Sequence, residues 1–148
     1  MPYSQIPEYL RRPILNIVKE ELLTPKGLRT LSPGDNKYIG KCEGDQNTRD
    51  LAYHQGTVWP WLMGHFTQAY INEYGSNGFI EIEKMRNDCK LLLDDPCLYT
   101  IPEIYNGDYP HIPVGAVAQA WSVAEMLRMK YLLANFTKRE EVYQTGMV

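Results

Sequence analysis

Two long irregular segments, residues 28–52 and 94–114, most constrain the fold, because they interrupt a chain that otherwise has helical periodicity. Turn-forming residues disfavour a long regular element in either one: Ser32-Pro33-Gly34-Asp35 in the first and Asn106-Gly107-Asp108 in the second. Irregular segments of this length inside a domain are usually functional when they are ordered. We therefore expect the functional residues of this protein to lie in these two loops.

The segments around the loops have the three- and four-residue apolar spacing of amphipathic helices. The predicted helices are residues 7–23, 60–74, 79–93 and 115–134, followed by a polar tail at 135–148. Their predicted buried faces are Leu10, Ile14, Ile17, Val18 and Leu22; Leu62, Met63, Phe66, Ala69 and Tyr70; Phe79, Ile82, Met85, Cys89, Leu92 and Leu93; and Val117, Trp121, Ala124, Met126 and Leu127.

Strand signals are weak, with two short possibilities at residues 28–31 and 37–41. The sequence therefore predicts a mainly α fold. Successive helices that run antiparallel would bring the two long loops to one face.

The composition is that of one globular unit: 148 residues, a net charge of −3 and 44% hydrophobic residues. We expect residues 1–134 to form this unit, with 135–148 as its tail. No basic stripe suggests nucleic acid, and no apolar run suggests a membrane span. The N-terminus lacks an apolar signal region, which favours a cytoplasmic protein. Three cysteines without a C-x-x-C pair make a disulfide framework or a zinc site unlikely, and no cofactor is indicated.

The stretch from Glu43 to Phe66, EGDQNTRDLAYHQGTVWPWLMGHF, combines many hydrogen-bonding groups with large aromatic rings. A pyranose has polar hydroxyls at its rim and apolar C–H faces, so it needs both kinds of contact. This stretch is therefore interpreted as one wall of a carbohydrate site. The candidate substrate-binding residues in it are Asp45, Tyr53, His54, Gln55, Trp59 and Trp61.

The second loop contains Glu103 and a further candidate substrate-binding residue, Asp108. Gln119, also a candidate for substrate binding, follows this loop in the last predicted helix. Cleavage of a glycosidic bond requires two carboxyl groups, and their separation, about 5–5.5 Å or about 6.5–9.5 Å, determines retention or inversion. Glu103 lies between Ile101-Pro102 and Ile104, and a carboxylate among apolar neighbours needs a firm partner or is held neutral. Glu103 is therefore the best candidate for a catalytic residue.

Several of these residues have simpler interpretations. Trp59 and Trp61 flank a proline and point in different directions, so one of them can equally pack in the core. His54 lacks the neighbouring histidine or cysteine spacing of a metal site. Asp108 lies in a turn, where an aspartate can simply bond its own backbone.

Several motifs resemble the C-terminal part of the bacterial and archaeal glycogen debranching enzyme family, its amylo-α-1,6-glucosidase catalytic domain. They are LLTPKGLRTLSPGDNKYIGKCEGDQNTRDLAYHQGTVWPWLMGHF, PEIYNGDYP and VGAVAQAWSVAEMLR, and the similarity extends to Arg128. The separations between Tyr53-His54-Gln55-Gly56, Glu103 and Gln119-Ala120-Trp121-Ser122 make the resemblance specific.

The resemblance implies part of an (α/α)6 toroid with two long active-site loops. It also implies hydrolysis, with inversion, of α-1,6-linked glucose in glycogen or a branched maltooligosaccharide. By this resemblance, Glu103 matches the family's general base, and the Tyr53–Trp59 segment matches its glucose subsite. The chain departs from the family in having no match to the upstream aspartate that acts as general acid, and in Cys42, where tyrosine is more usual.

These departures predict a chain that is inactive alone and exposes an apolar seam. An upstream half of the barrel, or a second copy of the chain, would cover that seam. Two other functions remain open. One is a non-catalytic carbohydrate-binding or interaction protein, and the other is a different toroidal glycosidase, for example one that resembles trehalase.

Overall fold

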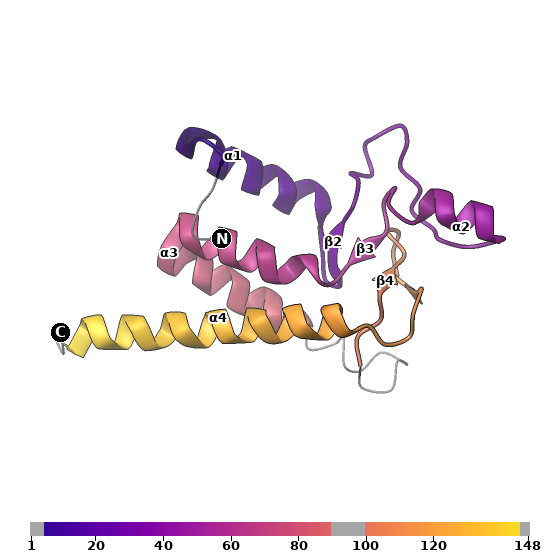
Figure 1. Ribbon diagram of the computed structural model, residues 1–148. Helices are drawn as coiled ribbons and strands as arrows, with labels where there is room; N and C mark the ends of the chain where they lie inside the picture. Colours follow the sequence, from indigo (N-terminus) through magenta and orange to yellow (C-terminus); the bar gives the residue numbers. More distant parts are fainter. Residues whose placement is uncertain (1–4, 90–99, 146–148) are drawn as a thin grey trace.

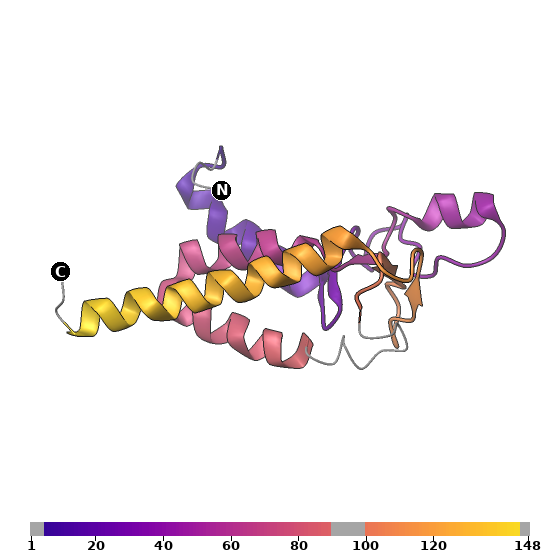
Figure 2. The same cartoon turned by 60° about the horizontal axis from the view of Figure 1, so that its bottom comes forward.

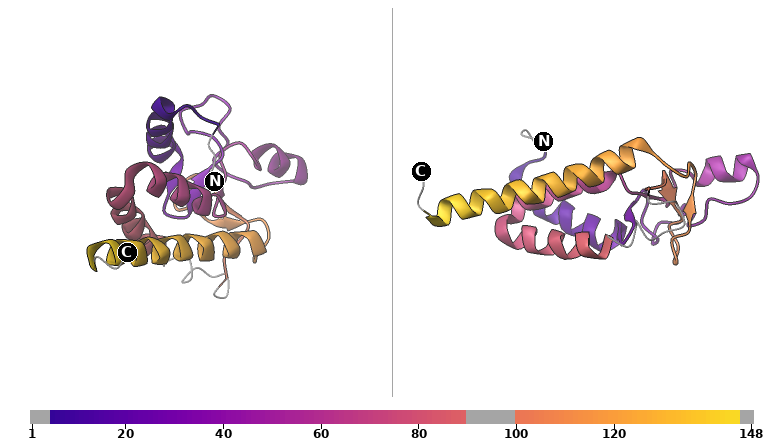
Figure 3. Two further views of the ribbon diagram at one scale, coloured as in Figure 1. Left: turned by 60° about the vertical axis from the view of Figure 1, so that its left-hand side comes forward. Right: turned by 90° about the horizontal axis from the view of Figure 1, so that it is seen from below.

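The computed structural model describes residues 5–89 and 100–145, which are mainly helical and include a small antiparallel sheet. The predicted mainly α class is therefore confirmed. The helices α1 (Glu8–Ile17), α3 (Leu62–Cys89) and α4 (Ala120–Thr145) form a layer with α3 in the middle (Figure 1). The sheet and the short helix α2 (Gln46–Ala52) lie at one end of this layer (Figure 3).

The first predicted helix, residues 7–23, is confirmed. Helix α1 begins directly after Pro7 and contains Pro13, and it continues as one π-helical turn, η1 (Val18–Leu22). This turn is tied to α3 by an ion pair in which Lys19 Nζ lies 2.7 Å from Glu81 Oε2.

Helix α3 consists of two arms that reverse direction at Gly75, as Figure 2 shows. Gly75 has φ 56° and ψ −132°, a conformation that residues with a side chain rarely adopt. The two predicted helices at 60–74 and 79–93 correspond to these arms. Residues 90–93 and the first part of the second predicted loop lie outside the described residues.

Helix α4 differs from the prediction at both ends. It begins at Ala120 instead of residue 115, because Gly115 has φ +74° and the backbone N–H of Gln119 bonds Ile101 O at 3.0 Å, outside any helix. It then continues to Thr145 through most of the segment that was expected to be a polar tail. Lysine, arginine and glutamate are good helix formers, so the polar composition of that segment does not oppose a helix.

The described residues contain one five-stranded antiparallel sheet in the order β1-β2-β3-β4-β5. Its strands are β1 (Leu23–Thr24), β2 (Gly27–Arg29), β3 (Val58–Trp59), β4 (Ile104–Tyr105) and β5 (Pro113–Val114). Of these strands, only β2 was predicted, by the weak signal at residues 28–31. Residues 37–41, the other possible strand, form no strand. Strands of two or three residues are too short to show an alternating pattern.

This sheet determines how the two loops meet. Val58 of β3 pairs with Tyr105 of β4, and Ile104 pairs with Val114 of β5. The pairing places β3, which follows the first loop in the chain, directly beside the second loop. The first loop and residues 100–114 of the second therefore lie at the same end of the helical layer, as the sequence predicted.

The largest core cluster lies between α1, both arms of α3 and α4. It consists of Leu15, Leu28, Met63, Phe66, Tyr70, Ile82, Met129 and Leu133. The buried face predicted for residues 60–74 is confirmed by Met63, Phe66 and Tyr70.

The faces predicted for the first and last helices were largely wrong. Ile17 of α1 is 59% exposed and Leu127 of α4 is 61% exposed. Leu10, Ile14, Val117 and Trp121 are exposed as well. The apolar stripes exist, but α4 packs against α3 through Met129 and Leu133, which leaves its predicted face uncovered.

Candidate functional site

Glu103 lies immediately before β4, where the second loop joins the sheet. Its backbone N–H donates to Ala116 O at 2.9 Å, so its main chain is fixed to the segment after β5. Its side chain is half-buried and accepts hydrogen bonds from three groups, one fifty residues earlier in the sequence and two shortly after β5.

The three donors surround the carboxylate. Tyr53 Oη donates to Glu103 Oε1 at 2.5 Å, and Gln119 Nε2 donates to the same oxygen at 3.4 Å. The backbone N–H of Ala116 donates to Oε2 at 3.1 Å. None of the three donors is charged. The structure thus brings together Glu103, Tyr53 and Gln119, three of the residues selected from the sequence.

Gly115 provides the space for this carboxylate. A Cβ atom at Gly115 would lie 2.7 Å from Glu103 Oε2, closer than any real contact allows. Its φ of +74° is also disfavoured for residues with a side chain. Gly115 was not selected from the sequence, where a single glycine after Pro113-Val114 gives no specific signal.

Tyr53 is oriented by aromatic neighbours. Its ring meets His54 and Trp59 edge-on, with centroid distances of 4.8 and 5.0 Å. Burial, followed by the hydrogen bond and the charge of Glu103, raises the pKa of the Tyr53 phenol far above its ordinary value. The phenol therefore remains protonated at neutral pH and acts as a donor to Glu103.

The two tryptophans have different environments. Trp59 is buried in a cluster with Cys42, Ala52 and Ile104, and its Nε1–H donates to Thr57 Oγ1 at 3.0 Å. Trp61 is half-buried and meets His65 edge-on at 5.6 Å. The core-packing alternative thus describes Trp59. The exposed His54 ring stacks on Trp59 with a centroid distance of 5.1 Å.

Asp108 joins the two loops instead of approaching Glu103. Its Oδ1 accepts a hydrogen bond from Tyr38 Oη at 3.0 Å, and its backbone N–H donates to Gly40 O at 3.1 Å. A Cβ at Gly40 would overlap the Asp108 carboxylate. Burial and the Asp108 contact raise the pKa of Tyr38.

Asn106 makes a second connection between the loops. Its Oδ1 accepts from the Cys42 N–H at 2.9 Å, and its Nδ2 donates to Glu43 Oε1 at 3.2 Å. Asn106 and Tyr38 are positioning residues, and Tyr38 was not selected from the sequence. The Asn106-Gly107-Asp108 turn was recognised, but the partners of its side chains belong to a segment about sixty residues earlier and could not be predicted from local sequence.

Asp45 and Gln55 lie outside the Glu103 cluster. Asp45 caps α2, because its Oδ1 accepts from both the N–H and the Oγ1 of Thr48 at 2.8 Å. These hydrogen bonds lower the pKa of Asp45. The backbone of Gln55 bonds Ile39 and Ala52. The sequence signal for this cap is the aspartate itself, which is among the preferred N-cap residues.

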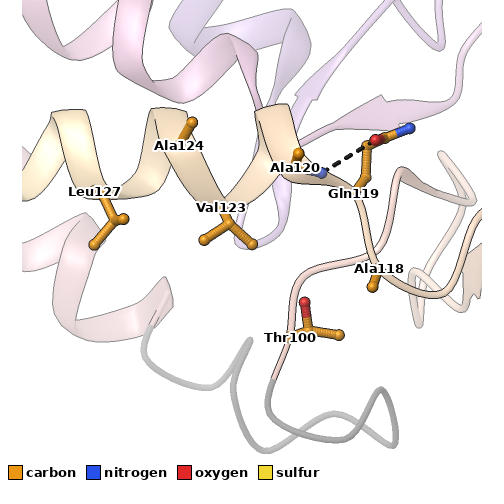
Figure 4. A pocket seen from close by; sticks show the side chains of 7 residues that line it. All are labelled: Thr100, Ala118, Gln119, Ala120, Val123, Ala124 and Leu127. Atoms are coloured by element: carbon orange, nitrogen blue, oxygen red, sulfur yellow. Dashed lines mark hydrogen bonds between the residues drawn. The ribbon is translucent and has the colours of Figure 1, made fainter.

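An open hollow of about 420 Å³ lies beside the start of α4 (Figure 4). It is lined by Thr100, Ala118, Gln119, Ala120, Val123, Ala124 and Leu127. Gln119 connects it to the carboxylate: Gln119 Oε1 accepts the Ala120 N–H at 3.1 Å, while Nε2 donates to Glu103. Most of the lining is apolar, so the hollow offers packing surface more than chemistry.

Among the described residues, no cluster of three or more histidine, cysteine, aspartate or glutamate side chains could hold a metal ion. The same part of the chain has no helix that is both long and apolar enough to span a membrane.

Comparison with known proteins places the chain among glycosidase sequences, since the family model described as amylo-alpha-1,6-glucosidase matches residues 1–128. The chain belongs to this family. It is also similar to the glycogen debranching enzyme of Saccharomyces cerevisiae, with 37% identity over 75 residues. That match covers 47% of this chain and 5% of the yeast enzyme, so the chain corresponds to a small part of the relative's length.

Proposed function

We propose that this chain supplies the general base of a debranching-type site, in which α-1,6-linked glucose at glycogen branch points is hydrolysed with inversion. The observation that carries the proposal is the environment of Glu103, whose carboxylate accepts hydrogen bonds from Tyr53, Gln119 and the Ala116 N–H. Membership of the amylo-alpha-1,6-glucosidase family supports the substrate class.

In the proposed reaction, Glu103 takes a proton from a water molecule as the water oxygen bonds to the anomeric carbon. The glycosidic C–O bond breaks, and its electron pair leaves with the departing oxygen, which takes a proton from a separate general acid. The product is glucose of inverted configuration, and Glu103 later returns its proton to solvent. General bases of this kind contribute roughly 10²- to 10⁴-fold to the rate.

The family resemblance assigns the general acid to a segment upstream of these residues. We therefore expect the 148-residue chain to hydrolyse natural α-1,6-glucosides very slowly when it is assayed alone. Loss of the acid should reduce the rate by about a hundredfold or more.

α-D-Glucosyl fluoride provides a direct test, because fluoride departs with little need for protonation. The C–F bond breaks with its electron pair, water attacks carbon, and only the base is required. Fluoride release should exceed the background rate and yield β-glucose, and Glu103→Gln should reduce it by roughly 10²- to 10⁴-fold. Azide should restore turnover to Glu103→Ala as β-glucosyl azide. Release that is unaffected by Glu103→Gln would reject this role for Glu103.

The same assay separates the two alternatives. A carbohydrate-binding protein without catalysis would bind maltooligosaccharide but release no fluoride, and His54→Ala or Trp61→Ala should weaken that binding. Because Trp59 is buried, Trp59→Ala would disturb folding and is not a clean test of binding. A trehalase-like enzyme, completed by the same upstream segment, would hydrolyse trehalose faster than an α-1,6-glucoside.

The proposal also covers the complete (α/α)6 toroid and the partner that would supply the rest of it. The exposed apolar residues on α1 and α4 support an (α/α)6 toroid in which further helices cover both faces, or self-association of the chain. A bacterial or archaeal source and a cytoplasmic location remain predictions from the sequence.

A further inference from the structure

We propose that Tyr53 is a positioning residue that fixes the Glu103 carboxylate, so that Oε2, rather than Oε1, takes the proton of the attacking water. This inference rests on the proposed function of Glu103. It assigns Tyr53 a role that differs from binding the sugar directly, the role first predicted for it.

The hydrogen bonds distinguish the two carboxylate oxygens. Each oxygen of an ionised carboxylate can accept about two hydrogen bonds. Oε1 accepts two, from Tyr53 at 2.5 Å and Gln119 at 3.4 Å. Among the described residues, the donor bonded to Oε2 is the Ala116 N–H at 3.1 Å. Oε2 therefore retains a lone pair for water, and Oε1 does not.

Tyr53 is suited to hold a carboxylate in one orientation. His54 and Trp59 meet its ring edge-on at 4.8 and 5.0 Å, and Thr57 Oγ1 donates to its backbone carbonyl at 2.6 Å. The ring and the main chain are thus both anchored, and the hydroxyl is directed at Glu103. A hydroxyl already committed to Oε1 has no second proton for a sugar oxygen.

Uncharged hydrogen-bond donors are also compatible with the proposed role of Glu103 as a general base. An arginine or lysine beside a carboxylate strongly favours its charged form and makes it a poorer proton acceptor. Neutral donors fix the orientation with a smaller loss of basicity. All three groups that bond Glu103 in the structure, a phenol, an amide and a backbone N–H, are of this kind.

The test is a double-mutant cycle in the full 148-residue chain with α-D-glucosyl fluoride as the substrate. Tyr53→Phe should lower kcat about tenfold to a hundredfold and change KM less than about twofold, since it misplaces the base and leaves substrate contacts intact. Tyr53→Phe/Glu103→Gln should be no slower than Glu103→Gln alone. Tyr74→Phe is the matched control, because its hydroxyl bonds Asn16 at 2.7 Å in the helical layer.

Two outcomes would overturn the positioning role. In the first, Tyr53→Phe raises KM and leaves kcat unchanged, which identifies a direct contact with the sugar. In the second, azide restores Glu103→Ala but not Tyr53→Phe/Glu103→Ala, which means that Tyr53 acts on the substrate even when the carboxylate is absent. Equal rescue of both variants is the expected result.

Failure of the proposed function has a different signature. The unmodified chain and Glu103→Gln would then release fluoride at the same rate. In that case the contact can still be tested by the melting temperatures of the unmodified chain, Tyr53→Phe, Glu103→Gln and the double variant. Shifts for Tyr53→Phe and Glu103→Gln that add in the double variant would show no coupling between the two side chains and would overturn the inference. A melting-temperature shift of the double variant that differs from the sum of the single shifts would support the Tyr53–Glu103 contact but not the hydrolytic role.

Discussion

The two ends of the molecule differ in the kind of contact that holds their side chains together. At the sheet end, polar side chains that are distant in sequence bond one another: Glu103 with Tyr53, and Asn106 with Glu43. At the helical end, large apolar side chains such as Ile17 and Leu127 lie on the surface. The Glu103 carboxylate is therefore held by hydrogen bonds from within the described residues, whereas the helical layer leaves apolar side chains exposed on α1 and α4. The hydrogen bonding of Glu103 and the covering of the exposed helix faces by further protein can therefore be tested separately.

The largest effect on stability should come from the closed core of the helical end. Met63 is 1% exposed, and Met63→Ala should lower the free energy of unfolding by about 2–5 kcal/mol, measured by urea denaturation. Ile82→Val provides a milder probe of the same core, with a loss of about 0.5–1.5 kcal/mol.

Ile17→Ala is the matched exposed control and should change stability by less than about 1 kcal/mol. If Met63→Ala and Ile17→Ala destabilised the chain equally, the core would not lie between α1, α3 and α4.

The next prediction concerns the sheet end. Gly115→Ala should reduce fluoride release about a hundredfold, because the new Cβ would lie 2.7 Å from Glu103 Oε2 and displace it. It should also reduce stability by roughly 1–3 kcal/mol through backbone strain.

Gly75→Ala is the control for strain, since Gly75 has φ +56° but no heavy atom near its missing Cβ. It should lower stability and leave the remaining folded protein active. Equal loss of activity in both variants would mean that strain, not contact with Glu103, is responsible.

These predictions depend on contacts that the sequence revealed only in part. The helical periodicity was sufficient for α1 and for both arms of α3, since apolar spacing and Gly75 mark them directly. Glu103 and its partners Tyr53 and Gln119 were selected because their chemistry stands out among loop residues.

The sheet and the exposed helix faces could not be predicted in the same way. The short strands depend on long-range pairing, such as that of Val58 with Tyr105, two residues that are both fully buried. An amphipathic stripe, as on α4, identifies an apolar face but does not say whether a neighbour in the same chain covers it. Asp108 looked like a ligand for substrate, and its bonds to Tyr38 and Gly40 depend on the same loop contact.

A smaller effect is expected at the ion pair between η1 and α3. The Lys19 hydrogen bond, followed by that of Tyr70, lowers the pKa of Glu81 below its ordinary value of 4.5. The folded state thus favours the carboxylate, so the pair stabilises the fold above the unfolded-state pKa and this contribution is lost as pH falls through the lower folded-state pKa.

Glu81→Gln should therefore narrow the difference in urea midpoint between about pH 7 and about pH 3. Glu83→Gln changes the charge equally but removes only a contact within one arm of α3, to Arg86. An identical pH response of the two variants would argue against the contribution of the Lys19 pair.

The smallest effect on stability should occur on the open face of α4. Leu127 and Tyr131 are 61% and 66% exposed, and with Trp121 and Ala124 they follow the spacing of one helical face. Leu127→Ser/Tyr131→Ser should change the free energy of unfolding by no more than about 0.5 kcal/mol per site, because neither side chain packs in the core. Association of the chain, measured by sedimentation over a range of concentrations, should decrease. A loss above about 2 kcal/mol would show that this face is packed in the folded chain.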